Sequence, residues 1–201
     1  MGNCNTPEEK IEFFTEWLSL DKYPFKILAI TSILADNQRA YRGTLNQFCE
    51  SLSIQPSSGN KSKIKETLVF LAENNYIKLV IDNQIYTISL AAAAANNPEV
   101  ITIKKAWYQL IRNNSGKESW GNTLKVFLHL IDFSDDNITT YKEIGKALNI
   151  SKSTVERCVK IICSIDFVDF EIQKTVVSKK QQDGSIVCLG QKYEQVLNFE
   201  K

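Results

Sequence analysis

The sequence predicts a mainly α-helical α+β protein in which two copies of one small domain follow each other. Each copy is expected to contain three helices and a small β-hairpin wing, preceded by a leader helix. Three observations predict this: an internal repeat, helical spacing of apolar residues within each copy, and β-rich sequence at the end of each copy. A chain of 201 residues with 43% hydrophobic residues is long enough for two small cores.

The repeat is clearest where residues 44–54 lie over residues 140–150 at an offset of 96, with Thr, Leu and Ile coinciding at three places. Farther along, Lys61 and Ser62 lie over Lys152 and Ser153 at an offset of 91, and apolar positions continue in step. The offset falls because the first copy carries five additional residues within 55–59, whose composition is typical of a loop. Duplication of one domain explains the pattern.

Within each copy, three segments with helical periodicity precede two β-rich segments. Thr44 and Thr140 are expected to cap the second helices, and Asp82 to Gln84 to form a tight hairpin turn. The predicted helices are 25–35, 44–52 and 61–74 in the first copy and 123–132, 140–148 and 151–164 in the second, and the predicted strands are 77–81, 85–90, 167–177 and 185–189.

A leader helix of about 12 to 15 residues is expected before each copy, because both starts place a capping residue, a proline and an acidic residue in order. These starts are Thr6-Pro7-Glu8 and Asn97-Pro98-Glu99, and the inward faces would carry Ile11, Phe14, Trp17 and Leu18 in one leader and Val100, Ile103, Trp107 and Leu110 in the other. The predicted domains are therefore residues 1–90 and 98–201, joined by a linker over residues 91–97.

The aromatic residues of the first leader have two interpretations. Phe13, Phe14 and Trp17 could form a homodimer interface between leader helices, or they could pack on their own domain. Both interpretations stay open at the level of sequence.

Charge is distributed unevenly along the chain. The formal net charge of +1 combines a balance of −4 over residues 1–21, +5 over residues 22–120 and 0 over residues 121–201. Nucleic-acid binding requires a basic face rather than a basic protein, so the near-neutral total does not exclude it.

Several function classes find little support in the residues. The five cysteines form no C-x-x-C pair, and Cys49 and Cys158 fall on apolar helix faces, so we expect no metal site. His129 lies among apolar residues and is expected in the core, which leaves no nucleophile–base set, and no phosphate-binding glycine loop occurs. We therefore expect a non-enzymatic cytoplasmic protein without cofactor or small-molecule substrate, and without membrane attachment, since no apolar run approaches the roughly 20 residues of a membrane span.

Residues 140–157 closely resemble a bacterial helix-turn-helix. The pattern places a small residue at Gly145, a turn residue at Asn149, a cap at Ser151 and an inward apolar residue at Val155. The first copy departs from it, with Cys49 at the small position and a lengthened turn. With a hairpin after each third helix, the chain resembles proteins with two tandem winged-helix domains, namely plasmid and phage replication initiators and transcriptional regulators of mobile elements.

That resemblance implies double-stranded DNA as partner, read by the third helix of each copy. Lysines, serines and an arginine at the start of a recognition helix contact base edges or phosphates, and wing lysines contact the backbone or minor groove. The expected DNA-binding residues are Lys61, Ser62, Lys63 and Lys65 in the first copy and Lys152, Ser153, Thr154, Arg157, Lys160, Lys174, Lys179 and Lys180 in the second. The alternative is a winged-helix scaffold for protein partners, favoured by the neutral balance of residues 121–201.

Overall fold

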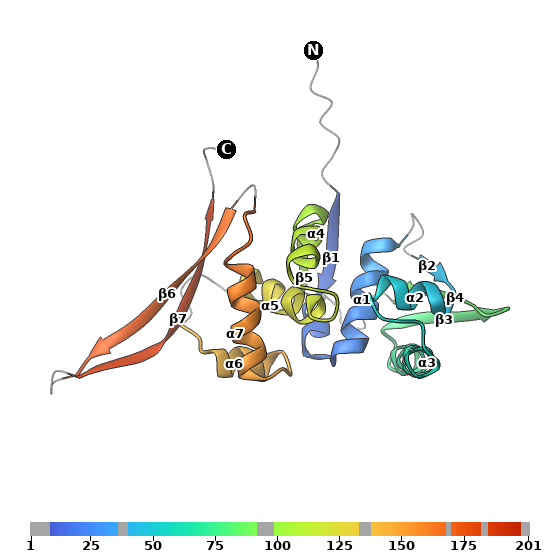
Figure 1. Ribbon diagram of the computed structural model, residues 1–201, viewed down its shortest axis with the longest axis horizontal. Helices are drawn as coiled ribbons and strands as arrows, with labels where there is room; N and C mark the ends of the chain where they lie inside the picture. The colour runs from blue at the N-terminus through green and yellow to red at the C-terminus, as the bar shows by residue number, and fades with distance from the viewer. Residues whose placement is uncertain are drawn as a thin grey trace, which may run out of the picture. The chain divides into compact units, whose positions relative to one another are not determined.

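The computed structural model describes residues 9–35, 40–91, 99–132, 138–167, 170–181 and 185–197. It is a mixed α+β structure with small antiparallel sheets, divided into two compact units, Met1–Gln109 and Leu110–Lys201, which we describe separately (Figure 1). The division falls inside α4 (Lys105–Asn114). Of the helices within the described ranges, none has the length and apolar character needed to span a membrane.

Unit 1 contains a helix–strand–helix–helix–hairpin succession. Its elements are α1 (Lys22–Leu34), β2 (Ala40–Gly43), α2 (Leu45–Ser51), α3 (Ser58–Glu73), β3 (Ile77–Asp82) and β4 (Ile85–Leu90). The strands form one antiparallel sheet in the order β2-β4-β3, so the strand that precedes α2 pairs with the last strand of the hairpin. Asn83 and Gln84 both have positive φ, 46° and 66°, as a two-residue type I′ turn requires. The expected tight hairpin is confirmed.

The prediction of a first leader helix is wrong. Residues Lys10–Phe14 form strand β1, followed by a 3₁₀ helix, η1 (Thr15–Ser19), and β1 pairs antiparallel with β5 (Val100–Lys104), where the second leader helix was expected to begin. Only α4, beyond β5, is helical in that second leader. Alternate residues are buried in both strands, Ile11 and Phe13 in one and Ile101 and Ile103 in the other, which is the period of a half-buried strand. β-branched residues suit this pairing better than a helix.

The aromatic residues of this segment pack inside unit 1. Phe13 and Trp17 are buried, and the rings of Phe14 and Trp17 meet edge to face at 4.9 Å. The backbone N–H of Lys105 donates to the Glu9 carbonyl at 2.8 Å, and its ammonium contacts the Glu9 carboxylate at the same distance. For Phe13 and Trp17 the interpretation of packing on their own domain is confirmed.

Unit 2 follows a matching succession. Its elements are α5 (Trp120–Asp132), α6 (Tyr141–Ala147), α7 (Lys152–Ile162), β6 (Phe170–Lys180) and β7 (Ile186–Leu197). Thr139, just before α6, exchanges two backbone hydrogen bonds with Gln191 of β7, so it takes the place that β2 has in unit 1. Gly190 permits this approach, because a Cβ there would lie 2.7 Å from the Thr139 carbonyl oxygen.

Two boundaries differ from the sequence-based expectation. Helix α3 begins at Ser58 rather than Lys61, because Ser57 accepts a hydrogen bond from the Asn60 N–H and so caps a helix that includes part of the five-residue insertion. The second hairpin is longer than expected, since β7 continues to Leu197 in register with β6. The predicted leader start at residues 6–8 and the segment 92–98, which holds most of the predicted linker, lie outside the described residues.

Candidate nucleic-acid interface

The turn between α6 and α7 has the geometry of a tight helix-turn-helix. A Cβ on Gly145 would lie 2.6 Å from the Ile150 carbonyl oxygen, so no larger residue fits there without a shift. Asn149 adopts a left-handed φ of 53°, and the Ser151 side chain accepts a hydrogen bond from the Thr154 N–H at 3.2 Å. The roles expected for these three residues are confirmed. Thr140 caps α6 in a capping box with Glu143, where these hydrogen bonds from Thr140 hold the Glu143 pKa below its usual value.

Unit 1 keeps this turn despite its insertion. Ser53 stands in the place of Asn149 with a φ of 60°, and the Ile54 N–H donates to the Cys49 carbonyl at 2.9 Å, as Ile150 donates to Gly145. The connection between the helices is nevertheless longer, residues 52–57 between α2 and α3 against residues 148–151 between α6 and α7, so the expected lengthening is confirmed, and the additional residues follow Ile54. Thr44 caps α2 in a capping box with Gln47, as predicted.

Helix α7 separates apolar and charged faces cleanly. Val155, Cys158, Val159 and Ile162 are buried, whereas Lys152, Ser153, Arg157 and Lys160 are exposed and Thr154 is half-buried. This is the inward stripe and outward polar set that the 3.6-residue period predicts. Four of the five expected DNA-binding residues of α7 are thus accessible on its outer face.

Contacts between side chains on α7 modify this outer face. Lys160 forms an ion pair with Glu156 at 3.0 Å, and this bond, together with the positive charge of Lys160, lowers the Glu156 pKa; Lys152 and Lys174 contribute less. The Ser153 and Thr154 hydroxyls lie 3.1 Å and 2.8 Å from the Ser151 hydroxyl at the N-cap. Lys152 and Arg157 are the two outer cations that project from the first half of the helix.

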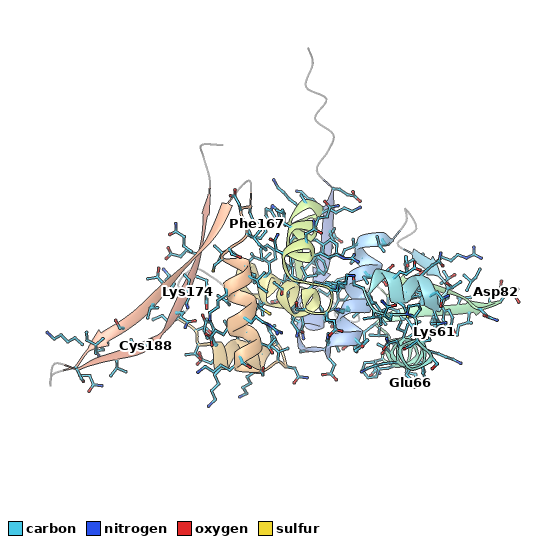
Figure 2. The ribbon with its side chains drawn as sticks, viewed as in Figure 1. Lys61, Glu66, Asp82, Phe167, Lys174 and Cys188 are labelled. Atoms are coloured by element: carbon cyan, nitrogen blue, oxygen red, sulfur yellow. The ribbon has the colours of Figure 1, made fainter. Side chains whose placement is uncertain are left out.

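The lysines of the second hairpin lie in two different settings. Lys179 and Lys180 are exposed at the end of β6, near exposed Ile186 and Val187. Lys174 is exposed as well, but it donates to the Tyr141 hydroxyl at 2.6 Å, with its ammonium 4.9 Å from the centre of that ring, on the side of the hairpin toward α7 (Figure 2). Beside it, burial and the neighbouring Tyr141 raise the Tyr193 pKa. This hydrogen bond of Lys174 therefore links the hairpin to α6.

The basic residues at the start of α3 are less available than those of α7. Lys61 is half-buried near Cys49, whose pKa is raised by burial and lowered in part by that lysine. Ser62 donates to the Glu66 carboxylate at 2.8 Å, and the Lys63 ammonium lies 4.2 Å above the Tyr23 ring. Lys65 is exposed. Figure 2 shows Lys61 and Glu66 on this helix.

Two buried lysines were not anticipated. Lys26 on α1 and Lys125 on α5 are 2% and 1% exposed, and the Lys125 ammonium donates to the Leu148 carbonyl, at the end of α6, at 2.7 Å. A cation suits the C-terminal end of a helix. The sequence carried a signal for this pair, since each lysine interrupts an apolar first helix and the two helices align at an offset of 99 when these lysines are superimposed.

The expected core residues are confirmed in part. Cys49 and Cys158 are buried, with burial raising the pKa of each thiol. His129 is half-buried rather than fully enclosed, and burial lowers its pKa.

Comparison with known proteins adds no family to this geometry: no family model matches the chain, and neither a curated protein nor a solved structure matches it.

Proposed function

We propose that the chain is a pair of winged-helix domains that binds double-stranded DNA, with α7 as the principal recognition helix. The support from architecture is the succession of elements in each unit. In unit 1 a helix, a strand, two helices and a hairpin share one sheet of order β2-β4-β3, and in unit 2 Thr139 pairs with the hairpin at the equivalent place. Such a scaffold presents its third helix to the major groove.

The observation that carries the proposal is the outer face of α7. A rigid turn, held by Gly145, Asn149 and the Ser151 cap, orients a helix whose inner stripe is fully buried. Its outer face then offers Lys152 and Arg157 within the first two turns, the part of a recognition helix that reaches base edges. Lys179 and Lys180 add two cations on the hairpin, suited to the phosphate backbone.

Unit 1 supports the proposal less strongly. Lys61, Lys63 and Lys65 remain candidates for DNA contact on α3. The same helix also exposes Val69 and Phe70 beside Glu66 and Glu73. An apolar and acidic surface favours a protein partner over phosphates. The scaffold alternative therefore applies best to α3. A role in replication initiation or in transcription control of a mobile element belongs to the proposal through the resemblance given above.

Salt dependence and one substitution test the proposal. Affinity for duplex DNA should fall steeply between low and physiological salt, because bound lysines and arginines release counterions from phosphates. After selection of a preferred site from a random library, Arg157→Ala should weaken binding by about 1–3 kcal/mol, or roughly 5- to 150-fold. Fluorescence anisotropy over a salt series measures both effects.

The matched control is Lys117→Ala, which removes one positive charge from an exposed position of unit 2 outside α6, α7 and the hairpin. It should change affinity by less than about twofold, since it lies on none of the elements proposed to contact DNA and interactions between exposed charges are weakened by salt. Absence of binding at low salt, or equal losses for the Arg157 and Lys117 variants, would contradict DNA reading by α7.

A further inference from the structure

The outer face of α3 carries an apolar patch that its own unit does not cover. Val69 and Phe70 are 39% and 42% exposed. They line a shallow hollow of about 440 Å³ along the helix, whose other lining residues are Ser62, Lys65, Glu66 and Glu73. Adjacent exposed apolar side chains are the kind of surface from which a contact with another macromolecule can be built.

Charges of opposite sign lie at equal distances on the two sides of this patch. Lys65, Val69 and Glu73 are spaced four residues apart, so they lie on one stripe of the helix, with a cation about 6 Å before Val69 and a carboxylate about 6 Å after it. Among the described residues, no ion pair involves Lys65 or Glu73. The nearby Glu66 is hydrogen-bonded to Ser62, toward the start of the helix.

This stripe is complementary to itself. If a second α3 packs antiparallel on the first, with a two-fold axis at Val69, Lys65 of each copy lies opposite Glu73 of the other. The two Val69 side chains meet at the axis with Phe70 beside them. Two equivalent ion pairs, each between Lys65 of one copy and Glu73 of the other, then flank one apolar centre, which is the form of an isologous interface.

We propose that the outer face of α3 binds a second copy of this chain in this antiparallel arrangement. The proposal goes beyond DNA binding and does not depend on it, because it concerns unit 1 without ligand. DNA is a poor occupant, since Glu66 and Glu73 would face phosphates. Because a contact over a few helical turns is small, the dimer should be weak, with a dissociation constant on the order of 10 µM.

Charge reversal on the full chain tests the arrangement. Sedimentation velocity without DNA, from about 1 to 200 µM protein, should show a monomer–dimer equilibrium. Lys65→Glu and Glu73→Lys should each raise the dissociation constant about tenfold, because each places like charges opposite each other twice. The double variant K65E/E73K should restore parental association, and an equimolar mixture of the two single variants should form a heterodimer.

Two controls separate this interface from general charge effects and from misfolding. Lys78→Glu reverses an exposed charge on β3 of the same unit and should leave association unchanged. Circular dichroism should show the parental helix content in every variant. A parent that stays monomeric throughout the range, single variants that associate like the parent, or a double variant that remains dissociated would overturn the proposal. DNA affinity measured separately shows whether the DNA proposal stands.

Discussion

Helices α3 and α7 share one place in the two units and one way of packing, but they present opposite surfaces. Each begins at a serine N-cap, and the buried positions Ile64 and Leu68 of α3 correspond to Val155 and Val159 of α7 at the offset of 91. On the outer side, the same offset places Glu66 where α7 has Arg157, and Val69 where α7 has Lys160.

The difference shows which constraints the two helices share. The inner stripe must fill a core of the same shape, so both helices keep apolar residues there. No such requirement applies to the outer stripe, which is free to suit different partners. In α7, Glu156 and Lys160 form an ion pair with each other within one helix. In α3, Lys65 and Glu73 lie about 12 Å apart along the helix axis, too far to pair with each other, and in the proposed dimer they pair with the second copy.

The largest expected effect comes from a comparison of one helical glycine in each unit, Gly145 of α6 and Gly59 of α3. Gly145→Ala should destabilise unit 2 by about 2–3 kcal/mol, because the added Cβ would stand 2.6 Å from the Ile150 carbonyl oxygen. Gly59→Ala, in the first turn of α3, should instead stabilise unit 1 by about 0.5–1 kcal/mol, since nothing lies within 4 Å of its Cβ position. Unfolding in urea, monitored by amide hydrogen exchange separately in each unit, measures both changes in stability. Equal effects would show that the glycines are not distinguished by packing.

A second prediction concerns Lys125, the buried lysine of α5 that donates to the end of α6. Lys125→Met should destabilise unit 2 by about 1–2 kcal/mol, because the Leu148 carbonyl loses a buried hydrogen bond from a cation at a helix end. Lys26→Met provides the comparison in unit 1, where the lysine is equally buried. If the Lys125 variant were more stable than the parent, the desolvation of the ammonium would outweigh its bond.

The smallest effect is a pH dependence confined to unit 2. Burial lowers the His129 pKa below its ordinary 6.5, so as pH falls below that value the unfolded chain takes up a proton first. The stability of unit 2 is therefore complete above about pH 6.5 and declines below it, by less than about 1 kcal/mol over the first pH unit. His129→Gln should remove this decline, so the unfolding midpoint of the variant should stay constant over the pH unit in which that of the parent falls. Unit 1 has Ile30 in the place of His129 when the first helices are aligned on Lys26 and Lys125, and it should show no such decline.

Features governed by neighbours in the chain were predictable. The first, second and third helices, the threonine and serine caps and the I′ turn all depend on contacts within about four residues, which a local pattern records. The tight turn between α6 and α7 follows from Gly145, Asn149 and Ser151 for the same reason. The exposed positions of Lys152 and Arg157 on α7 also follow, since helical period alone separates them from the buried stripe.

Contacts between distant parts of the chain were decided only in the tertiary structure. Five residues such as Lys10–Phe14 fit a helix or a strand, and pairing with β5 resolves the choice because neither strand can satisfy its backbone groups without the other. Lys174, an expected DNA contact of the second hairpin, is exposed and also donates to Tyr141 of another element, a contact that a local pattern does not record. The sequence by itself therefore determined the helices and their caps, through short-range hydrogen bonds and periodicity. Strand partners, buried lysines and the surface left open on α3 depend on which elements meet, and that follows from the packing of the whole unit.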